Sequence, residues 1–85
     1  MTRGIVEVKV VKGYDSEKIT RSIGKIDGVR DLYEVTGDYD IVAIFDNKDM
    51  DSLNSSIDKV RKTSGVIDTL TTIVLKEYGV GKKSK

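Results

Sequence analysis

The residues that could bind a small molecule lie in two stretches of this chain. One is the turn Gly37-Asp38-Tyr39-Asp40, called the tip below, and the other carries hydroxyls at Thr69, Thr71 and Thr72. Glycine lets backbone N–H groups face an anion, a carboxylate accepts from an ammonium, and a hydroxyl can donate or accept. Together these groups could hold both ends of a free amino acid. Simpler interpretations stay open, because glycine and aspartate also make plain turns and threonine is common in strands.

Most catalytic and metal-binding chemistry is excluded by composition. The chain has no histidine and no cysteine, so it lacks the usual general base, the thiolate nucleophile and the soft or imidazole metal ligands. Asp46, Asp49 and Asp51 gather where a helix is expected to start, and helix capping explains them better than a calcium loop, whose spacing and final glutamate are missing. We therefore expect no catalytic residue, no metal and no cofactor, and a protein that is not an enzyme.

Length and charge indicate one small cytoplasmic domain. We expect a folded domain over residues 1–78 and a flexible basic tail over residues 79–85, with Lys82, Lys83 and Lys85 solvated. The formal net charge is +1, from 15 basic and 14 acidic side chains spread along the chain. This distribution argues against direct nucleic-acid binding, and no apolar run is long enough for a membrane span. A charged fraction of 34% with no proline, cysteine or histidine fits a thermophilic source.

Hydrophobic spacing predicts strands at residues 5–12, 29–36 and 41–45, and a last strand within residues 66–78 that is strongest at 69–75. The third strand is an unbroken apolar run, typical of a strand buried on both faces. The second and third strands form a hairpin, with the tip as its turn.

Apolar residues three or four positions apart predict two helices, at Ile19, Ile23 and Ile26 and at Met50, Leu53, Ile57 and Val60. We expect Asp15 or Ser16 to cap the first helix and Asp49 the second. Gly28 and Gly65 are expected to end the helices, each followed by valine.

The two halves of the chain repeat the same order of elements, which predicts an α+β, ferredoxin-like βαββαβ domain. Right-handed crossovers would place the first and third strands at the centre of a four-stranded antiparallel sheet, with both helices on one face. The other face would carry apolar side chains that a monomer leaves exposed. We therefore expect a homodimer formed through the sheet, a dimeric α+β barrel.

The chain also resembles a known family. The matching residues are Gly28-Val29, residues 33–41, Gly65-Val66 and residues 69–72, and the most specific segment is Val-Thr-Gly-Asp-Tyr-Asp at 35–40. They are similar to the RAM domain, the amino-acid-sensing module of the Lrp/AsnC (feast/famine) transcription regulators. The resemblance covers residues 5 to about 78.

The resemblance implies dimers that pair through their sheets and gather into octameric or similar rings of dimers. It also implies that an amino-acid effector binds between dimers, against the tip and the last strand. Carried over by position, the ligand-binding residues are Gly37, Asp38, Tyr39, Asp40, Thr71 and Thr72. Asp40 either touches the ligand or orients the tip.

Full-length members of the family carry a helix-turn-helix domain, whereas this sequence starts at the first strand. The resemblance therefore implies a stand-alone module that modulates transcription regulation by assembly, including hetero-assembly with full-length Lrp/AsnC regulators. Three alternatives stay open: an ACT-like amino-acid-binding domain, a small dimeric ferredoxin-like enzyme, and a structural partner that binds no metabolite.

Overall fold

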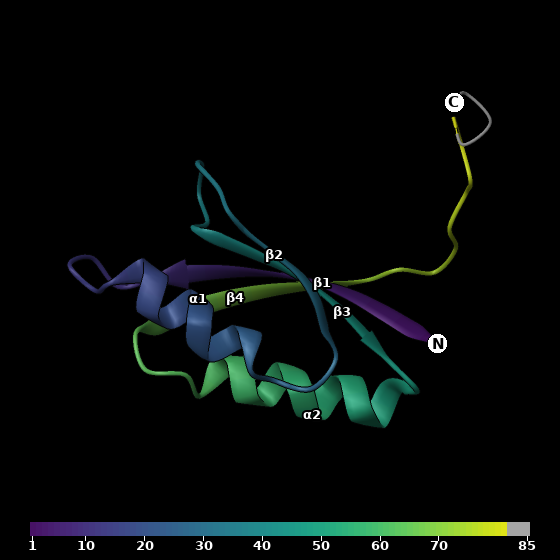
Figure 1. Cartoon of the computed structure of the whole chain (residues 1–85), viewed down its shortest axis with the longest axis horizontal. Coiled ribbons are helices and arrows are strands. Elements are labelled where there is room, and N and C mark those ends of the chain that lie inside the picture. The colour runs from purple at the N-terminus through teal and green to yellow at the C-terminus, as the bar shows by residue number, and fades with distance from the viewer. Residues whose placement is uncertain (82–85) are drawn as a thin grey trace.

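The computed structural model describes residues 1–81, so the three tail lysines lie outside the described residues. Its elements are β1 (Thr2–Val10), α1 (Ser16–Gly24), β2 (Val29–Glu34), β3 (Ile41–Asn47), α2 (Met50–Arg61) and β4 (Val66–Ile73). The strands form one antiparallel sheet in the order β2-β3-β1-β4. Both helices lie on one side of this sheet (Figure 1). The predicted ferredoxin-like βαββαβ fold, with the first and third strands central, is confirmed.

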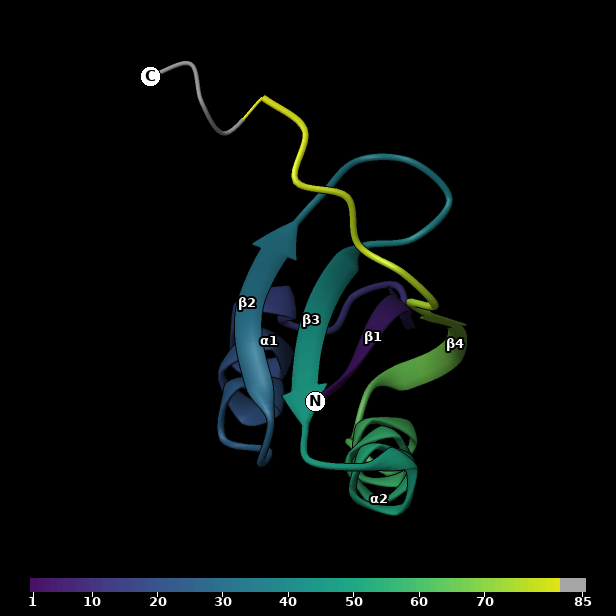
Figure 2. The ribbon, with the colours of Figure 1, turned by 90° about the vertical axis from the view of Figure 1, so that its right-hand side faces the viewer.

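The hydrophobic core lies between the sheet and the two helices. It consists of alternate residues of β1 and β3 and the apolar stripes of the helices: Val6, Val8, Ile41, Ala43, Phe45, Ile19, Ile23, Leu53, Ile57 and Val60. Val42 and Ile44 point the other way and are only half-buried. None of the described elements covers the second face (Figure 2), so burial of this strand on both faces stays a prediction that depends on a second copy.

Each helix begins at a predicted capping residue. The Asp15 carboxylate accepts from the backbone N–H groups of Glu17 and Lys18, and the Asp49 carboxylate accepts from that of Ser52 at 2.8 Å. The Ser52 N–H lowers the pKa of Asp49, because it stabilises the ionised carboxylate. These bonds satisfy N–H groups that a helix start would otherwise leave unpaired. Neither of the described helices is long and apolar enough to cross a membrane.

The predicted helix ends are wrong. The helices stop at Gly24 and Arg61, whereas Gly28 and Gly65 each lie directly before a strand with φ of +94°. A Cβ at Gly28 would lie 2.5 Å from the Asn47 side chain. The two glycines therefore make tight entries into β2 and β4.

The last strand is shorter than predicted. β4 ends at Ile73, and one further ladder bond joins the Val74 N–H to the Arg3 carbonyl at 2.9 Å. Beyond it, Leu75 has an exposed fraction of 95%. Residues 74–80, called the arm below, leave the sheet and extend away from the body of the domain (Figure 1).

Candidate functional site

The tip connects β2 to β3 and lies against the C-terminal end of β1. The Asp40 N–H donates to the Val8 carbonyl at 2.9 Å, and one Asp40 carboxylate oxygen accepts from the Val10 N–H at 2.8 Å. The Lys9 ammonium donates to the Asp38 carbonyl at 2.7 Å. Asp40 therefore orients the tip with both its backbone and its side chain.

Gly37 is an exposed residue of the tip. Its φ is +129°, which favours glycine. A Cβ placed there would meet no atom within 4 Å. The backbone around Gly37 is thus open to a ligand or to a second molecule.

Tyr39 is half-buried at this end of the sheet, among acidic side chains. Burial raises the pKa of the Tyr39 hydroxyl, and the carboxylates of Asp68, Glu7 and Asp38 raise it further. Both effects disfavour the phenolate, so the hydroxyl stays protonated and can donate a hydrogen bond. The same carboxylates would attract an ammonium group.

The threonines of β4 do not form one cluster with the tip. Thr71 pairs with Val6 and faces the helices, whereas Thr72 pairs with Ile5 and lies exposed on the opposite face. The β4 position level with the tip is Thr69, which pairs with Val8 and lies across β1 from the start of β3. Thr72 is three residues further along β4, about 10 Å from Thr69. Within one chain, the structure does not bring the six predicted site residues together.

Thr71 differs from Thr72 in its surroundings as well. Its hydroxyl is buried and has no hydrogen-bond partner among the described residues. It borders a cavity of about 320 Å³ between β4 and α2, lined by Asn54, Ile57 and Arg61 among others. An incoming polar group or a water molecule could satisfy this hydroxyl only from the helix side.

The face of the sheet away from the helices, called the open face below, has apolar side chains near its middle and charged side chains around them. Residues that pair across neighbouring strands point to the same face. By this register, the side chains near the middle of the open face are Ile5, Glu7, Val42, Ile44, Leu70, Thr72 and Tyr33. Leu70 and Tyr33 have exposed fractions of 49% and 53%. Such a contiguous apolar surface is typical of an interface.

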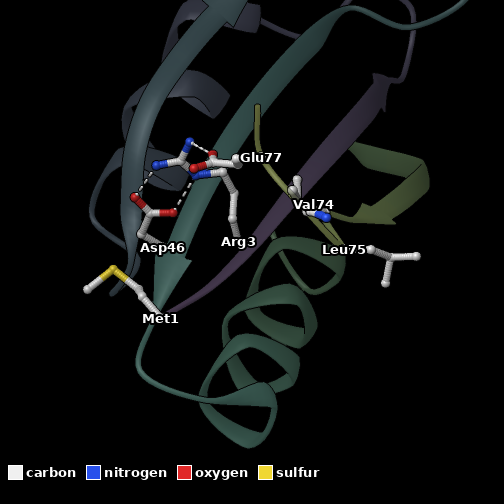
Figure 3. A pocket seen from close by; sticks show the side chains of 7 residues that line it. Met1, Arg3, Asp46, Val74, Leu75 and Glu77 are labelled. Atoms are coloured by element: carbon white, nitrogen blue, oxygen red, sulfur yellow. Dashed lines mark hydrogen bonds and ion pairs between the residues drawn. The ribbon is translucent and has the colours of Figure 1, made fainter. Parts of the chain in front are cut away.

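A charged cluster lies at the other end of the open face, and sequence reasoning missed it. Arg3 forms two parallel bonds to the Asp46 carboxylate, at 2.7 and 2.8 Å, and its remaining nitrogen pairs with Glu77 of the arm (Figure 3). The Arg3 hydrogen bond lowers the pKa of Asp46. A cavity of about 270 Å³ lies beside these residues, bordered by Met1 and Leu75.

The assignment of Asp46 to a helix start is therefore wrong, because it is a β3 residue paired with Arg3. Asp49 is the helix cap, and Asp51 lies in the first turn of α2 as expected. The pairing of Arg3 with Asp46 follows from strand register, which residues 43 positions apart do not reveal in sequence.

Comparison with known proteins gives a consistent family signal. Residues 3–82 match the family model described as the Lrp/AsnC ligand binding domain. The regulator LysM from Saccharolobus solfataricus is 40% identical over 76 residues, which cover 89% of this chain and 54% of that protein. Homocitrate synthase from Saccharolobus islandicus is 38% identical over 73 residues, covering 86% of this chain and 16% of the enzyme.

Among solved structures, a transcriptional regulator from Neisseria meningitidis in complex with L-methionine has a TM-score of 0.78 and 24% identity, over 89% of this chain and 51% of that one. This likeness shows the fold. The chain thus spans about half the length of the regulators that it matches.

Proposed function

Since the chain belongs to the Lrp/AsnC ligand-binding domain family, we propose that it is an amino-acid-sensing regulatory module that works by assembly. The observation that carries the proposal is the tip, which is fixed on β1 beside an uncovered apolar face. The L-methionine complex of the Neisseria regulator supports an amino acid as the effector.

The first level of assembly is a homodimer that packs two open faces together. Such packing would bury Leu70 and Tyr33 and complete the burial of Val42 and Ile44, which the single chain leaves half-exposed. At about 25 cal/mol per Å² of apolar surface, this burial is the main favourable term available to so short a chain.

The effector binds where such dimers meet, in a ring that could hold four dimers. The proposed ligand-binding residues are Gly37, Asp38, Tyr39, Asp40 and Thr72, with Asp40 acting through the tip that it orients; the sequence-based assignment of Thr71 to the same site is dropped, because its hydroxyl faces α2 on the other side of the sheet. Because Thr72 lies about 10 Å along β4 from Thr69, the position level with the tip, and β1 separates β4 from the tip, a free amino acid needs groups from a neighbouring chain to be held at both ends. The acidic surroundings of Tyr39 suit the ammonium end, and the open backbone at Gly37 suits the carboxylate end.

Ligand binding would then bias assembly. Each charge-assisted hydrogen bond contributes about 1.5–3 kcal/mol, so a Kd of about 10 μM to 1 mM is expected after association costs. A ligand at a hundredfold excess over its Kd stabilises the oligomer that completes its pocket by about 2.7 kcal/mol.

The output of the module depends on what it assembles with. Hetero-assembly with full-length Lrp/AsnC regulators is the output that we propose, since the curated relatives include the regulator LysM. The homocitrate synthase match favours a second candidate, in which the same kind of module senses an amino acid for an enzyme.

Isothermal titration with the twenty amino acids, followed by sizing with the strongest binder, tests the proposal. We expect at least one amino acid to bind in the stated range and to change the size distribution. The Asp38→Asn variant should weaken binding, whereas Asp58→Asn, on the exposed side of α2, should not. Absence of binding by every amino acid at millimolar concentration would contradict the sensing function.

A further inference from the structure

The arm exposes more apolar surface than its position in a single chain explains. Leu75, Tyr78 and Val80 have exposed fractions of 95%, 73% and 85%. The arm is held to its own chain through the Val74 N–H and through the ion pair of Glu77 with Arg3. Apolar side chains presented on an extended segment are typical of a segment that packs against another molecule.

The arm and the tip stand at opposite ends of the open face. Glu77 of the arm pairs with the Arg3 side chain, and the tip carbonyl of Asp38 accepts from the Lys9 side chain. Arg3 and Lys9 point to the same side of β1, because they are an even number of residues apart, and about 20 Å separates them. Both segments rise on the side of the sheet away from the helices (Figure 1).

From this arrangement we infer that the arm of one copy lies across the tip of a second copy, so that the partner's Tyr78 forms one wall of the ligand site beside Tyr39. The inference rests on the face-to-face dimer of the proposed function. In this dimer the two-fold axis lies between the two sheets, at right angles to β1 and level with Val6. Rotation about it puts the arm end of one open face over the tip end of the other. It therefore places each arm on the other copy's tip.

The other face-to-face arrangement has its axis along the strands, and it would put tip against tip and arm against arm. Electrostatics argues against this second arrangement. The carboxylates of Glu7, Asp38 and Asp68 lie near Tyr39, and they would meet the same three carboxylates of the partner and repel them. The arm instead carries the ammonium of Lys76, 5.4 Å from the ring centre of Tyr78, while its one carboxylate, Glu77, is already paired with Arg3 of its own chain. Pairing arm with tip brings that cation to the acidic end of the partner.

Cysteine cross-linking distinguishes the two arrangements, because the chain contains no cysteine of its own. The double variant Asp38→Cys/Tyr78→Cys, treated with a short bismaleimide, should give a covalent dimer in high yield. Tyr78→Cys alone should give little, since the two arms are at opposite ends. The matched control Ser22→Cys/Tyr78→Cys, with the first cysteine on the exposed side of α1, should stay uncoupled.

Two outcomes would overturn the inference: efficient self-coupling of Tyr78→Cys, or a double variant that sizes as a dimer and does not cross-link. Neither outcome touches the proposed dimer, which sizing of the unmodified chain tests separately.

The affinity for the effector gives a second test of this inference. Tyr78→Ala should weaken effector binding about five- to tenfold by removing an aromatic wall, with unchanged circular dichroism. Tyr14→Ala changes a tyrosine on the helix side and should leave the affinity unchanged. Equal affinities of Tyr78→Ala and the unmodified chain would contradict a role for the arm in the site.

Discussion

At the scale of single residues, Tyr39 is the side chain whose chemistry the fold changes most clearly at the tip. Its hydroxyl is shifted to a higher pKa by burial and by three nearby carboxylates. We expect a spectrophotometric titration to show one phenol that ionises above the ordinary value of about 10, and this phenol should be missing from Tyr39→Phe. Identical titration curves for the two proteins would contradict the acidic environment described for this residue.

The ionisation of Asp46 should make the stability of the fold depend on pH. Its pKa is lowered in the folded chain by the Arg3 hydrogen bond. Since the folded pKa lies below the unfolded one, the stabilisation is fully present above the ordinary carboxyl pKa of about 4 and is lost as the pH falls through the folded value.

We therefore expect Asp46→Asn to be less stable than the unmodified chain at pH about 7, with a difference that shrinks in strong acid. Urea unfolding at a series of pH values measures this difference in the free energy of unfolding. Asp58→Asn, which removes an exposed i,i+3 pair with Arg61, is the control and should differ little at any pH. A difference between Asp46→Asn and the unmodified chain that stays constant down to strong acid would show that the ion pair does not stabilise the fold.

At the scale of the elements, the glycine entries into the strands offer a matched test. Gly28 and Gly13 share a similar positive φ, +94° and +90°. A Cβ at Gly28 would overlap the Asn47 side chain, whereas one at Gly13 would meet nothing within 4 Å. Gly13→Ala should cost about 1 kcal/mol for backbone strain, and Gly28→Ala about 2 kcal/mol more for the clash.

Denaturant unfolding of the two variants measures that difference. Equal losses would mean that Asn47 moves away freely. This is not expected, because the Asn47 amide donates to Ser56, which in turn donates to the Asp27 carbonyl.

The order and type of the elements were predictable because periodicity reports which side of an element is buried. The stripe Leu53, Ile57 and Val60 was found this way, although Met50, predicted as its first member, is exposed. The caps Asp15 and Asp49 were predicted from residue type instead. Helix ends were not, since a glycine with positive φ serves a strand entry as well as a helix end. The overlong last strand has a similar cause, because Leu75 and Tyr78 have strand-like composition but no neighbour to pair with in one chain.

The candidate site was predictable only as a set of residue types. The tip could be located because glycine and aspartate between two strands indicate a turn, and Asp40 does orient it. Alternation along β4 already places Thr71 and Thr72 on opposite faces. The Arg3–Asp46–Glu77 cluster depends on strand register and on the path of the arm, neither of which leaves a local pattern in sequence.

At the scale of the whole molecule, the open face should control association. Leu70→Lys replaces an exposed apolar side chain of the proposed interface with a charged one, and we expect it to weaken dimerisation about a hundredfold, because an ammonium would have to leave water for an interface that is apolar around it. Met50→Lys, at an exposed position on α2, is the control and should leave the dimer intact. A Leu70→Lys variant that associates as well as Met50→Lys would exclude the open face as the interface.

Sedimentation velocity at micromolar concentration, with and without each amino acid, tests the central claim most directly. We predict dimers or multiples of dimers, with a distribution that at least one amino acid shifts at concentrations up to about 1 mM. A single 9.4 kDa species that no amino acid changes would contradict both the assembly and the sensing.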